Sequence, residues 1–186
     1  EGLEREHVWV IDPIDGTRAF ISGVPVWGTL IGFYRNGRAV MGLMDQPFTG
    51  ERYFADGGQS HYAGPGGPRV LKTRRCETLE DAVMFTTSPR IIAGHLQAGY
   101  DRLEAHVRLA RYGTDCYAYC LLAAGFVDLV VETGLKPYDI GALIPIIEQA
   151  GGVVTTANGG RAEDGGDIVA AATPALHAAA LAVLNG

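Results

Sequence analysis

The sequence contains no long apolar run, no extended basic cluster and few cysteines. A membrane-spanning helix needs roughly 18 to 20 consecutive apolar residues. The sequence of 186 residues contains no apolar run of this length, so we expect no membrane insertion. The formal net charge is −6 and the longest basic cluster covers residues 72–75, so we expect no nucleic-acid partner. The cysteines, Cys76, Cys116 and Cys120, are odd in number and lack zinc-ligand spacing, which predicts reduced thiols in a cytoplasmic protein.

The composition is sufficient for a globular core, since 47% of the residues are hydrophobic and 19% are charged. The first part of the chain indicates strands joined by turns. Asn36-Gly37 between two strand-like runs is the strongest short-range signal of a β-hairpin. Residues 56–69 are rich in glycine and proline and predict turns and loop. The predicted strands of this part cover residues 7–11, 27–34, 39–44 and 51–55.

After residue 78 the pattern changes to alternating strands and helices. We therefore predict an α+β part at residues 1–78, with an antiparallel sheet, and an α/β part at residues 79–186. The clearest helix covers residues 138–150, where isoleucine and leucine recur at helical spacing before a Gly-Gly stop. The other predicted elements are strands at residues 80–85, 107–112, 126–131, 152–155 and 167–171, and helices at 114–125, within 89–104 and at 174–184.

Two carboxylates three residues apart follow the first predicted strand. Asp12 and Asp15 lie across a turn that Pro13 restricts, so both side chains can converge on one point at the carboxyl end of that strand. Hard cations such as Mg²⁺ bind carboxylate oxygens together with water and substrate phosphate, and the carbonyl of Ile14 is a candidate for a further ligand. An ordinary loop rich in turn-forming residues explains the same pattern equally well.

The residues after this acid pair suit a phosphate group. Gly16 has no side chain to keep a phosphate from the backbone, and Thr17 offers a hydroxyl and an amide at the start of a short predicted helix. A third acid, Asp139, stands at the start of the clearest helix. Asp139 either complements the helix dipole or joins Asp12 and Asp15 in one site between two strand-to-helix junctions, where α/β proteins bind ligands.

Two motifs resemble the signatures of the inositol monophosphatase-like superfamily. The first is WVIDPIDGT at residues 9–17, followed by Phe20 and Gly23. The second is PYDIGA at residues 137–142, which leads into EQAGG at residues 148–152 and has Tyr138 where Trp is usual. The resemblance extends over essentially the whole chain. It implies a layered αβαβα sandwich, Mg²⁺-dependent hydrolysis of small phosphate monoesters by an activated water, and a homodimer.

Within the superfamily, the chain is most similar to the bacterial histidinol-phosphatases, in stretches such as GTRAFI at residues 16–21 and GTDCYAY at residues 113–119. This resemblance implies hydrolysis of L-histidinol phosphate in histidine biosynthesis. It assigns metal binding to Asp12, the Ile14 carbonyl, Asp15 and Asp139, catalysis to Asp12, Asp15 and Thr17, phosphate binding to Gly16 and Thr17, and contact with the rest of the substrate to Asp115 and Glu132. Two acids suit the cationic histidinol, although Asp115 also fits a simple helix cap.

Two other functions stay open. A phosphatase of inositol monophosphate or another small ester would share every metal residue and differ only in the pocket. A catalytically inert relative that binds Mg²⁺ is favoured by one departure from the family. Family members carry additional helices and a Gly-Glu-Glu motif, with a metal-binding Glu, upstream of the first strand. Glu1 is either the second Glu of that motif or unrelated to it, so we expect the N-terminal helices to be missing from this chain.

Overall fold

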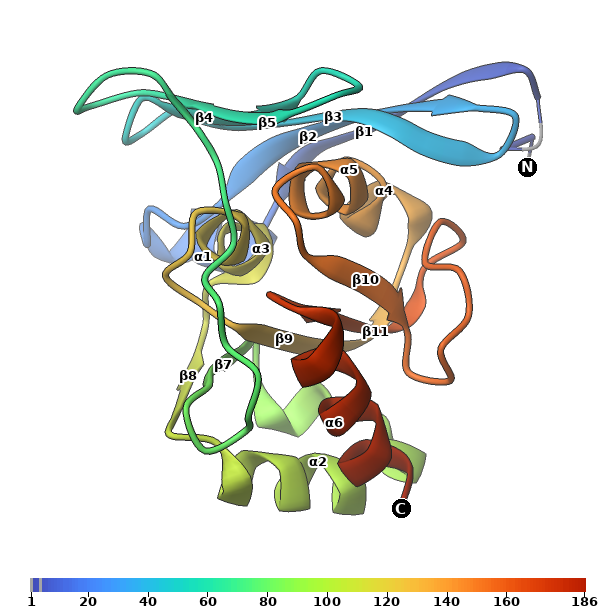
Figure 1. The fold of residues 1–186 in the computed structure, drawn as a ribbon. Helices are drawn as coiled ribbons and strands as arrows, with labels where there is room; N and C mark the ends of the chain where they lie inside the picture. The colour runs from blue at the N-terminus through green and yellow to red at the C-terminus, as the bar shows by residue number, and fades with distance from the viewer. Residues whose placement is uncertain (1, 4) are drawn as a thin grey trace.

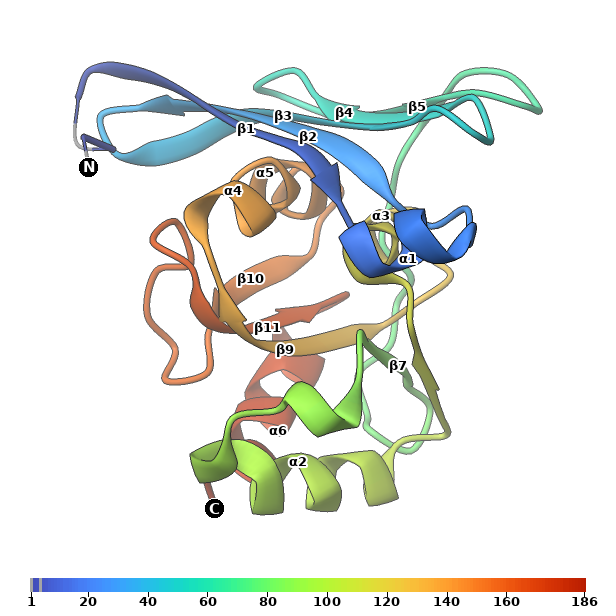
Figure 2. The same cartoon turned by 180° about the vertical axis from the view of Figure 1, so that it is seen from behind.

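A computed structural model describes residues 2–3 and 5–186 of the chain. Sheets and helices alternate in four layers (Figure 1). A six-stranded sheet forms the first layer, helices the second, a five-stranded sheet the third and two further helices the fourth (Figures 1 and 2). Glu1, the candidate for the upstream metal ligand, lies outside the described residues.

The first sheet is antiparallel throughout and follows the order of the chain, β1-β2-β3-β4-β5-β6. The predicted hairpin is confirmed between β2 and β3. Asn36 and Gly37 have φ of 52° and 73°, the left-handed values that a two-residue hairpin turn of this type needs. The strands are β1 (His7–Asp15), β2 (Gly28–Arg35), β3 (Arg38–Gln46), β4 (Glu51–Ala55), β5 (Ser60–Ala63) and β6 (Arg69–Val70).

Two predictions for this sheet are wrong in part. The loop predicted at residues 56–69 contains β5 and the start of β6. Ser60 and Tyr62 are buried and alternate with half-buried neighbours, but glycines and prolines close to this short strand obscure its period. β1 also continues past Asp12 to Asp15, with an irregular register against β2. β1 is an edge strand, where a proline is tolerated because its missing N–H breaks no ladder bond.

The second sheet is mixed, with the order β10-β11-β9-β7-β8. β7 pairs in parallel with β8 and β9, whereas β11 pairs in antiparallel with β9 and β10. Alternate residues of β9 belong to different cores: Val130 packs with the first sheet, and Leu129 and Val131 pack with the outer helices. Burial on both faces explains the continuous apolar runs of the sequence here. The strands are β7 (Val83–Thr86), β8 (Leu109–Tyr112), β9 (Leu129–Leu135), β10 (Val153–Thr156) and β11 (Gly166–Ala171).

Helices α3, α4 and α5 lie between the sheets, and α2 and α6 cover the outer face of the second sheet (Figures 1 and 2). The helix predicted at residues 138–150 is two helices, because Pro145 has no N–H to donate to the Gly141 carbonyl one turn earlier. No helix in the described part of the chain is both long and apolar enough to cross a bilayer. The helices are α1 (Thr17–Ser22), α2 (Gly94–His106), α3 (Asp115–Ala123), α4 (Pro137–Ile140), α5 (Leu143–Glu148) and α6 (Pro174–Asn185), with a 3₁₀ turn at Pro89–Ile91.

Two glycines let the turn between α4 and α5 lie directly against the first sheet. Gly32 of β2 pairs with Gly42 of β3. A Cβ atom on Gly42 would lie 2.0 Å from the carbonyl oxygen of Ala142, and one on Gly32 would lie 2.9 Å from the carbonyl carbon of Gly141. This close approach brings α4, which carries Asp139, against β1 and β2.

Gly42→Ala is therefore expected to lower the free energy of unfolding by about 1–3 kcal/mol, because the added methyl group must displace backbone. Urea unfolding measures the change. The matched control is Gly58→Ala, where an added Cβ would meet nothing closer than Asp56 Oδ1 at 3.7 Å. The control should change stability by less than about 0.5 kcal/mol. Equal losses from both variants would show that the contact at Gly42 has no special importance.

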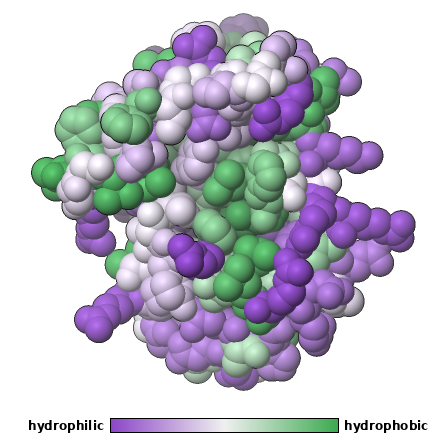
Figure 3. Space-filling model, turned by 90° about the vertical axis from the view of Figure 1, so that its left-hand side faces the viewer, coloured by the Kyte–Doolittle hydropathy of each residue, from purple (hydrophilic) through white to green (hydrophobic). Residues whose placement is uncertain are grey.

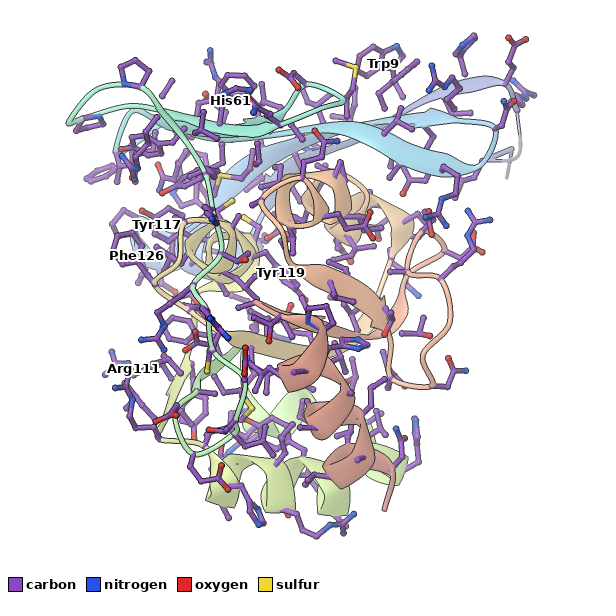
Figure 4. The ribbon with its side chains drawn as sticks, viewed as in Figure 1. Trp9, His61, Arg111, Tyr117, Tyr119 and Phe126 are labelled. Atoms are coloured by element: carbon purple, nitrogen blue, oxygen red, sulfur yellow. The ribbon has the colours of Figure 1, made fainter. Side chains whose placement is uncertain are left out.

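The outer face of the first sheet is not covered by any described residue. Trp9 is 63% exposed and Ile11 is 56% exposed (Trp9 is labelled in Figure 4). An apolar hollow of about 470 Å³ lies between Trp9, Met41 and Phe54. The described residues form two sheets and two helical layers, so the predicted layered-sandwich fold class is confirmed.

The division of the chain near residue 78 remains a prediction. The first sheet ends at Val70 and the second begins at Val83. One buried cluster nevertheless joins the two parts, with Leu30 and Met44 from the first and Ile147 from the second. The two parts therefore share a core.

Candidate active site

The structure brings together the three acids of the two motifs. Asp12 and Asp15 lie in the last part of β1 and Asp139 lies in α4. One carboxylate oxygen from each lies within 4.8 Å of the other two. Hard cations take carboxylate oxygens at roughly 2.0 to 2.6 Å, so one ion placed between these oxygens can reach all three.

One backbone amide orients each of these carboxylates. The three hydrogen bonds run from Ile14 N–H to Asp12 Oδ1 at 3.0 Å, from Cys116 N–H to Asp15 Oδ1 at 3.0 Å and from Lys136 N–H to Asp139 Oδ2 at 2.7 Å. Each bond holds one oxygen of its carboxylate and leaves the second for a cation. The donors to Asp12 and Asp139 are two and three residues away in the chain, whereas the donor to Asp15 comes from α3, so only the orientation of Asp15 depends on a distant segment.

Burial and mutual repulsion raise the pKa values of two of these acids. Burial raises the pKa of Asp15 to about 7; hydrogen bonds with Cys116 oppose this shift, and the charges of Asp139 and Glu132 add to it. Burial also raises the pKa of Asp139, and the neighbouring Asp12 contributes to the increase. A divalent cation would neutralise the negative charge that the fold concentrates here.

Asp15→Asn is expected to stabilise the metal-free protein at pH 8. The folded-state pKa of Asp15, about 7, lies above its ordinary value of 3.8, so the wild type loses stability as the pH rises between these values. The variant has no proton to lose. The difference in the free energy of unfolding should be near zero at pH 4 and should approach about 4 kcal/mol at most above pH 7. Urea unfolding in EDTA at several pH values measures it.

Saturating Mg²⁺ should reverse the order and make the wild type the more stable protein, because a ligand stabilises the form that binds it. A stability difference that does not vary with pH would contradict the raised pKa of Asp15.

The backbone turns sharply between β1 and α1. Gly16 has φ of 78°, and a Cβ atom on it would lie 3.2 Å from the Cβ of Asp115, so a larger residue would be strained here. Thr17 begins α1, and its hydroxyl donates to the Ile14 carbonyl at 3.1 Å. The carbonyl predicted to bind metal and the hydroxyl predicted to act in catalysis are thus in direct contact.

The acids border a cavity of about 490 Å³. Six of the eight predicted site residues line it: Asp15, Gly16, Thr17, Asp115, Glu132 and Asp139. The other two, Asp12 and Ile14, join this set through the carboxylate cluster and the Thr17 hydroxyl. The structure therefore gathers both motifs and both predicted substrate acids around one space.

Glu132 and Asp115 differ in what they leave for a substrate. Glu132 is only 4% exposed; Thr87 N–H donates to its Oε1 at 2.9 Å and the Tyr119 hydroxyl donates to its Oε2 at 3.1 Å. Both oxygens of Glu132 therefore already accept hydrogen bonds. Asp115 is partly exposed, and burial raises its pKa against the opposing charge of Arg18. Asp115 is the better placed of the two acids to contact a substrate.

Asp115 also has an unusual backbone conformation. Its φ is 45°, and among the described non-glycine residues only Asn36, in the hairpin turn, shares a positive φ. This region costs an L-residue roughly 1–2 kcal/mol, so the surrounding contacts must hold Asp115 in it. The N-cap residue of α3, Thr114, makes no side-chain cap hydrogen bond, and the Cys116 N–H of the first turn donates to Asp15 instead of Asp115, which speaks against the alternative of Asp115 as a helix cap.

Sequence reasoning assigned no function to three further polar or charged residues of the cavity lining, Arg18, Thr87 and Tyr119. Arg18 is the only basic residue in the described lining, and its position directly after Gly16 and Thr17 is the one signal that points to it. Thr87 and Tyr119 contribute through their hydrogen bonds to Glu132, and no local spacing in the sequence reveals those contacts.

Known proteins are similar to this chain in sequence. A sequence model described as "Inositol monophosphatase family" matches residues 1–185. The chain is 47% identical over 157 residues to "Bifunctional phosphatase IMPL2, chloroplastic" of Arabidopsis thaliana, with 84% of this chain and 44% of that protein covered. It is 35% identical over 144 residues to a histidinol-phosphatase of Chlorobaculum parvum, with 77% of this chain and 55% of that protein covered. The chain thus spans about half the length of these two relatives.

A solved structure extends the similarity to three dimensions. An inositol monophosphatase from Zymomonas mobilis is 38% identical to the chain and superposes with a TM-score of 0.92. The match covers 98% of this chain and 72% of that one, and therefore extends over both sheets.

Proposed function

Because the chain belongs to the inositol monophosphatase family, we propose that it carries the active site of a metal-dependent phosphomonoesterase. One observation carries the proposal: Asp12, Asp15 and Asp139 direct oxygens to one point beside a cavity that Gly16 and Thr17 also border. A cluster of hard oxygen ligands next to an open backbone turn fits a divalent cation beside a phosphate group.

We propose Mg²⁺ as the ion, bound by Asp12, Asp15, Asp139 and the Ile14 carbonyl. When bound, it would lower the pKa of a water, screen the phosphate charge and stabilise the leaving alkoxide. The Thr17 hydroxyl would orient the attacking water, and the turn at Gly16 would admit the phosphate oxygens close to the backbone. The water would attack phosphorus, the ester P–O bond would break, and a proton from the water would pass to the leaving alkoxide, so that the products are the alcohol and inorganic phosphate. No residue of the chain acts as a nucleophile in this scheme.

For the alcohol we propose L-histidinol, which places the reaction in histidine biosynthesis. The support is Asp115, a partly exposed carboxylate in the cavity wall, together with the similarity to a protein named histidinol-phosphatase. The protonated amine of histidinol can donate a charge-assisted hydrogen bond to a carboxylate. The neutral hydroxyls of a polyol gain less.

Inositol monophosphate is the second candidate substrate. The Zymomonas mobilis protein with the same fold is named an inositol monophosphatase. In addition, each oxygen of Glu132 already accepts one hydrogen bond from the protein, so Glu132 has less free acceptor capacity than Asp115 for a cationic group. These observations weaken the preference for histidinol phosphate over inositol monophosphate. The carboxylate of Asp115 still favours the cationic substrate.

The test is the initial rate of phosphate release by the full-length protein from L-histidinol phosphate and from inositol 1-phosphate, with Mg²⁺ and with EDTA. We expect kcat/KM to be at least roughly tenfold higher for L-histidinol phosphate, and EDTA to stop release from both esters. Faster release from inositol 1-phosphate would replace the proposed substrate. Mg²⁺ binding without release from either ester would identify an inert metal-binding relative.

We also propose that the protein is a homodimer. Near the cavity, α1 exposes Phe20 (46%) and Ile21 (77%), and Val24 beside it is 44% exposed. Figure 3 shows apolar side chains gathered on the side of the molecule that carries α1 in Figure 1. Apolar patches on a protein surface commonly mark interfaces. Size-exclusion chromatography with light scattering should give twice the subunit mass, and the mass of one subunit would refute the dimer.

A further inference from the structure

Four hydroxyl groups converge on the carboxylate of Glu51, the first residue of β4. Tyr53 and Tyr62 each donate to Oε1 at 3.1 Å, and Tyr117 and Thr49 donate to Oε2 at 2.6 and 2.8 Å. Burial acts to raise the pKa of Glu51, but the four hydrogen bonds outweigh it, so the pKa lies below its usual value. Glu51 is therefore a charged acceptor at neutral pH that is held by hydroxyl groups.

Tyr117 connects this carboxylate to the cavity. Tyr53 and Tyr62 belong to the same sheet as Glu51, whereas Tyr117 lies in the first turn of α3, two residues after Asp115. Its hydrogen bond is the shortest of the four. Glu51 thus ties the start of α3 to the six-stranded sheet.

The first turn and a half of α3 has three anchors, each on a different strand. The bonds are Cys116 N–H to Asp15 in β1, the Tyr117 hydroxyl to Glu51 in β4, and the Tyr119 hydroxyl to Glu132 in β9. Figure 4 shows Tyr117 and Tyr119 on different sides of α3. Together these anchors hold Asp115 at its φ of 45°, a conformation that persists only where the surroundings impose it.

We propose that Glu51 is a positioning residue of the active site. Through Tyr117 it fixes the start of α3, and this turn places the Asp115 carboxylate in the cavity wall and the Cys116 amide on Asp15. Glu51 itself does not line the cavity, so it acts only through these residues. The proposal rests on the phosphatase function proposed above, and its test therefore includes a measurement that is independent of turnover.

Two variants of the full-length protein test it. Tyr117→Phe removes only the hydroxyl that joins α3 to Glu51, and Glu51→Gln keeps the shape of the side chain but replaces one acceptor oxygen with a donor group. Both should raise the Mg²⁺ dissociation constant roughly three- to tenfold and lower kcat/KM for L-histidinol phosphate roughly tenfold. Removing a residue that binds a metal ligand directly typically costs about ten- to a hundredfold in metal affinity or activity. We expect losses at or below the lower end of this range, because Glu51 contacts Tyr117 and does not contact a metal ligand itself.

Titration calorimetry with Mg²⁺ reports on the site whether or not the ester is hydrolysed. A wild type that binds Mg²⁺ but releases no phosphate would overturn the phosphatase function, while the Mg²⁺ affinities of the variants would still decide the role of Glu51. If Glu51→Gln does not fold, Tyr117→Phe decides alone.

Tyr100→Phe is the matched control. Tyr100 is buried in α2, and its hydroxyl donates to Glu104 at 2.9 Å, so the variant loses the same kind of bond in a different layer. It should lower Tm by a similar amount but change Mg²⁺ affinity and kcat/KM by less than about twofold. Wild-type Mg²⁺ affinity and kcat/KM in Tyr117→Phe, or an equal loss in Tyr100→Phe, would overturn the positioning role.

Discussion

Asp12→Asn is expected to lower kcat by roughly three orders of magnitude, equivalent to about 4 kcal/mol of transition-state stabilisation. The amide removes the negative charge that a hard cation needs. It keeps the shape of the side chain and an oxygen that can accept the N–H of Ile14, which donates to Asp12 Oδ1 at 3.0 Å. Phosphate release at saturating Mg²⁺ should therefore collapse while Tm shifts by only a few degrees.

Asp139→Asn should behave in the same way, since its amide oxygen can still accept the N–H of Lys136. Asp101→Asn is the control for removing a carboxylate: Asp101 is exposed on α2, accepts a hydrogen bond from Gln97 at 2.8 Å and should be dispensable for activity. The metal assignment fails if Asp12→Asn retains the wild-type rate at limiting Mg²⁺, or if EDTA leaves the wild-type rate unchanged.

Asp115→Asn is expected to lower kcat/KM for L-histidinol phosphate by roughly ten- to a hundredfold, about 1.5 to 3 kcal/mol. The variant loses the charge-assisted hydrogen bond to the cationic amine. Asn tolerates the left-handed backbone of this position, so the substitution removes the charge without adding strain. The rate with p-nitrophenyl phosphate, whose leaving group carries no cation, should stay near the wild-type value.

Parallel kinetics on the two esters and a melting curve separate a substrate contact from a structural role. Equal losses on both esters would remove the structural support for histidinol. If Tm falls as well, Asp115 serves mainly to hold α3. Glu132→Gln provides a useful comparison, because both oxygens of Glu132 bind protein groups and its loss should affect both esters alike.

The correct predictions concern features that depend on neighbours in the chain. Asn36 and Gly37 adopt left-handed φ values at little cost, so the hairpin could be located from two residues. Gly16 is required where a Cβ atom would crowd Asp115, and the motif around it marked the turn that follows the acid pair. Asp12 and Asp15 converge in the structure as their spacing predicted, while their role as metal ligands stays a prediction.

The errors concern features that depend on distant partners. β5 and β6 exist because they extend a sheet that β4 begins, and the glycine-rich loops around them obscure this signal. The break between α4 and α5 has a local cause in Pro145, but its close approach to Gly32 and Gly42 depends on strands far away in the sequence. The substrate contact of Glu132 stays a prediction, and the sequence did not reveal that Thr87 and Tyr119 each donate a hydrogen bond to one of its oxygens.

The sequence by itself determined the chemistry of the site: which side chains offer oxygen ligands, where a phosphate can approach the backbone, and to which family the motifs are similar. Only the tertiary structure decided how these groups are used. It brought Asp139 within reach of Asp12 by packing α4 on two glycines, and it anchored α3 to Glu51 through Tyr117. The physical reason is that a residue's type and local spacing fix what it can bind, whereas its orientation, pKa and free hydrogen-bonding capacity depend on groups that only folding places beside it.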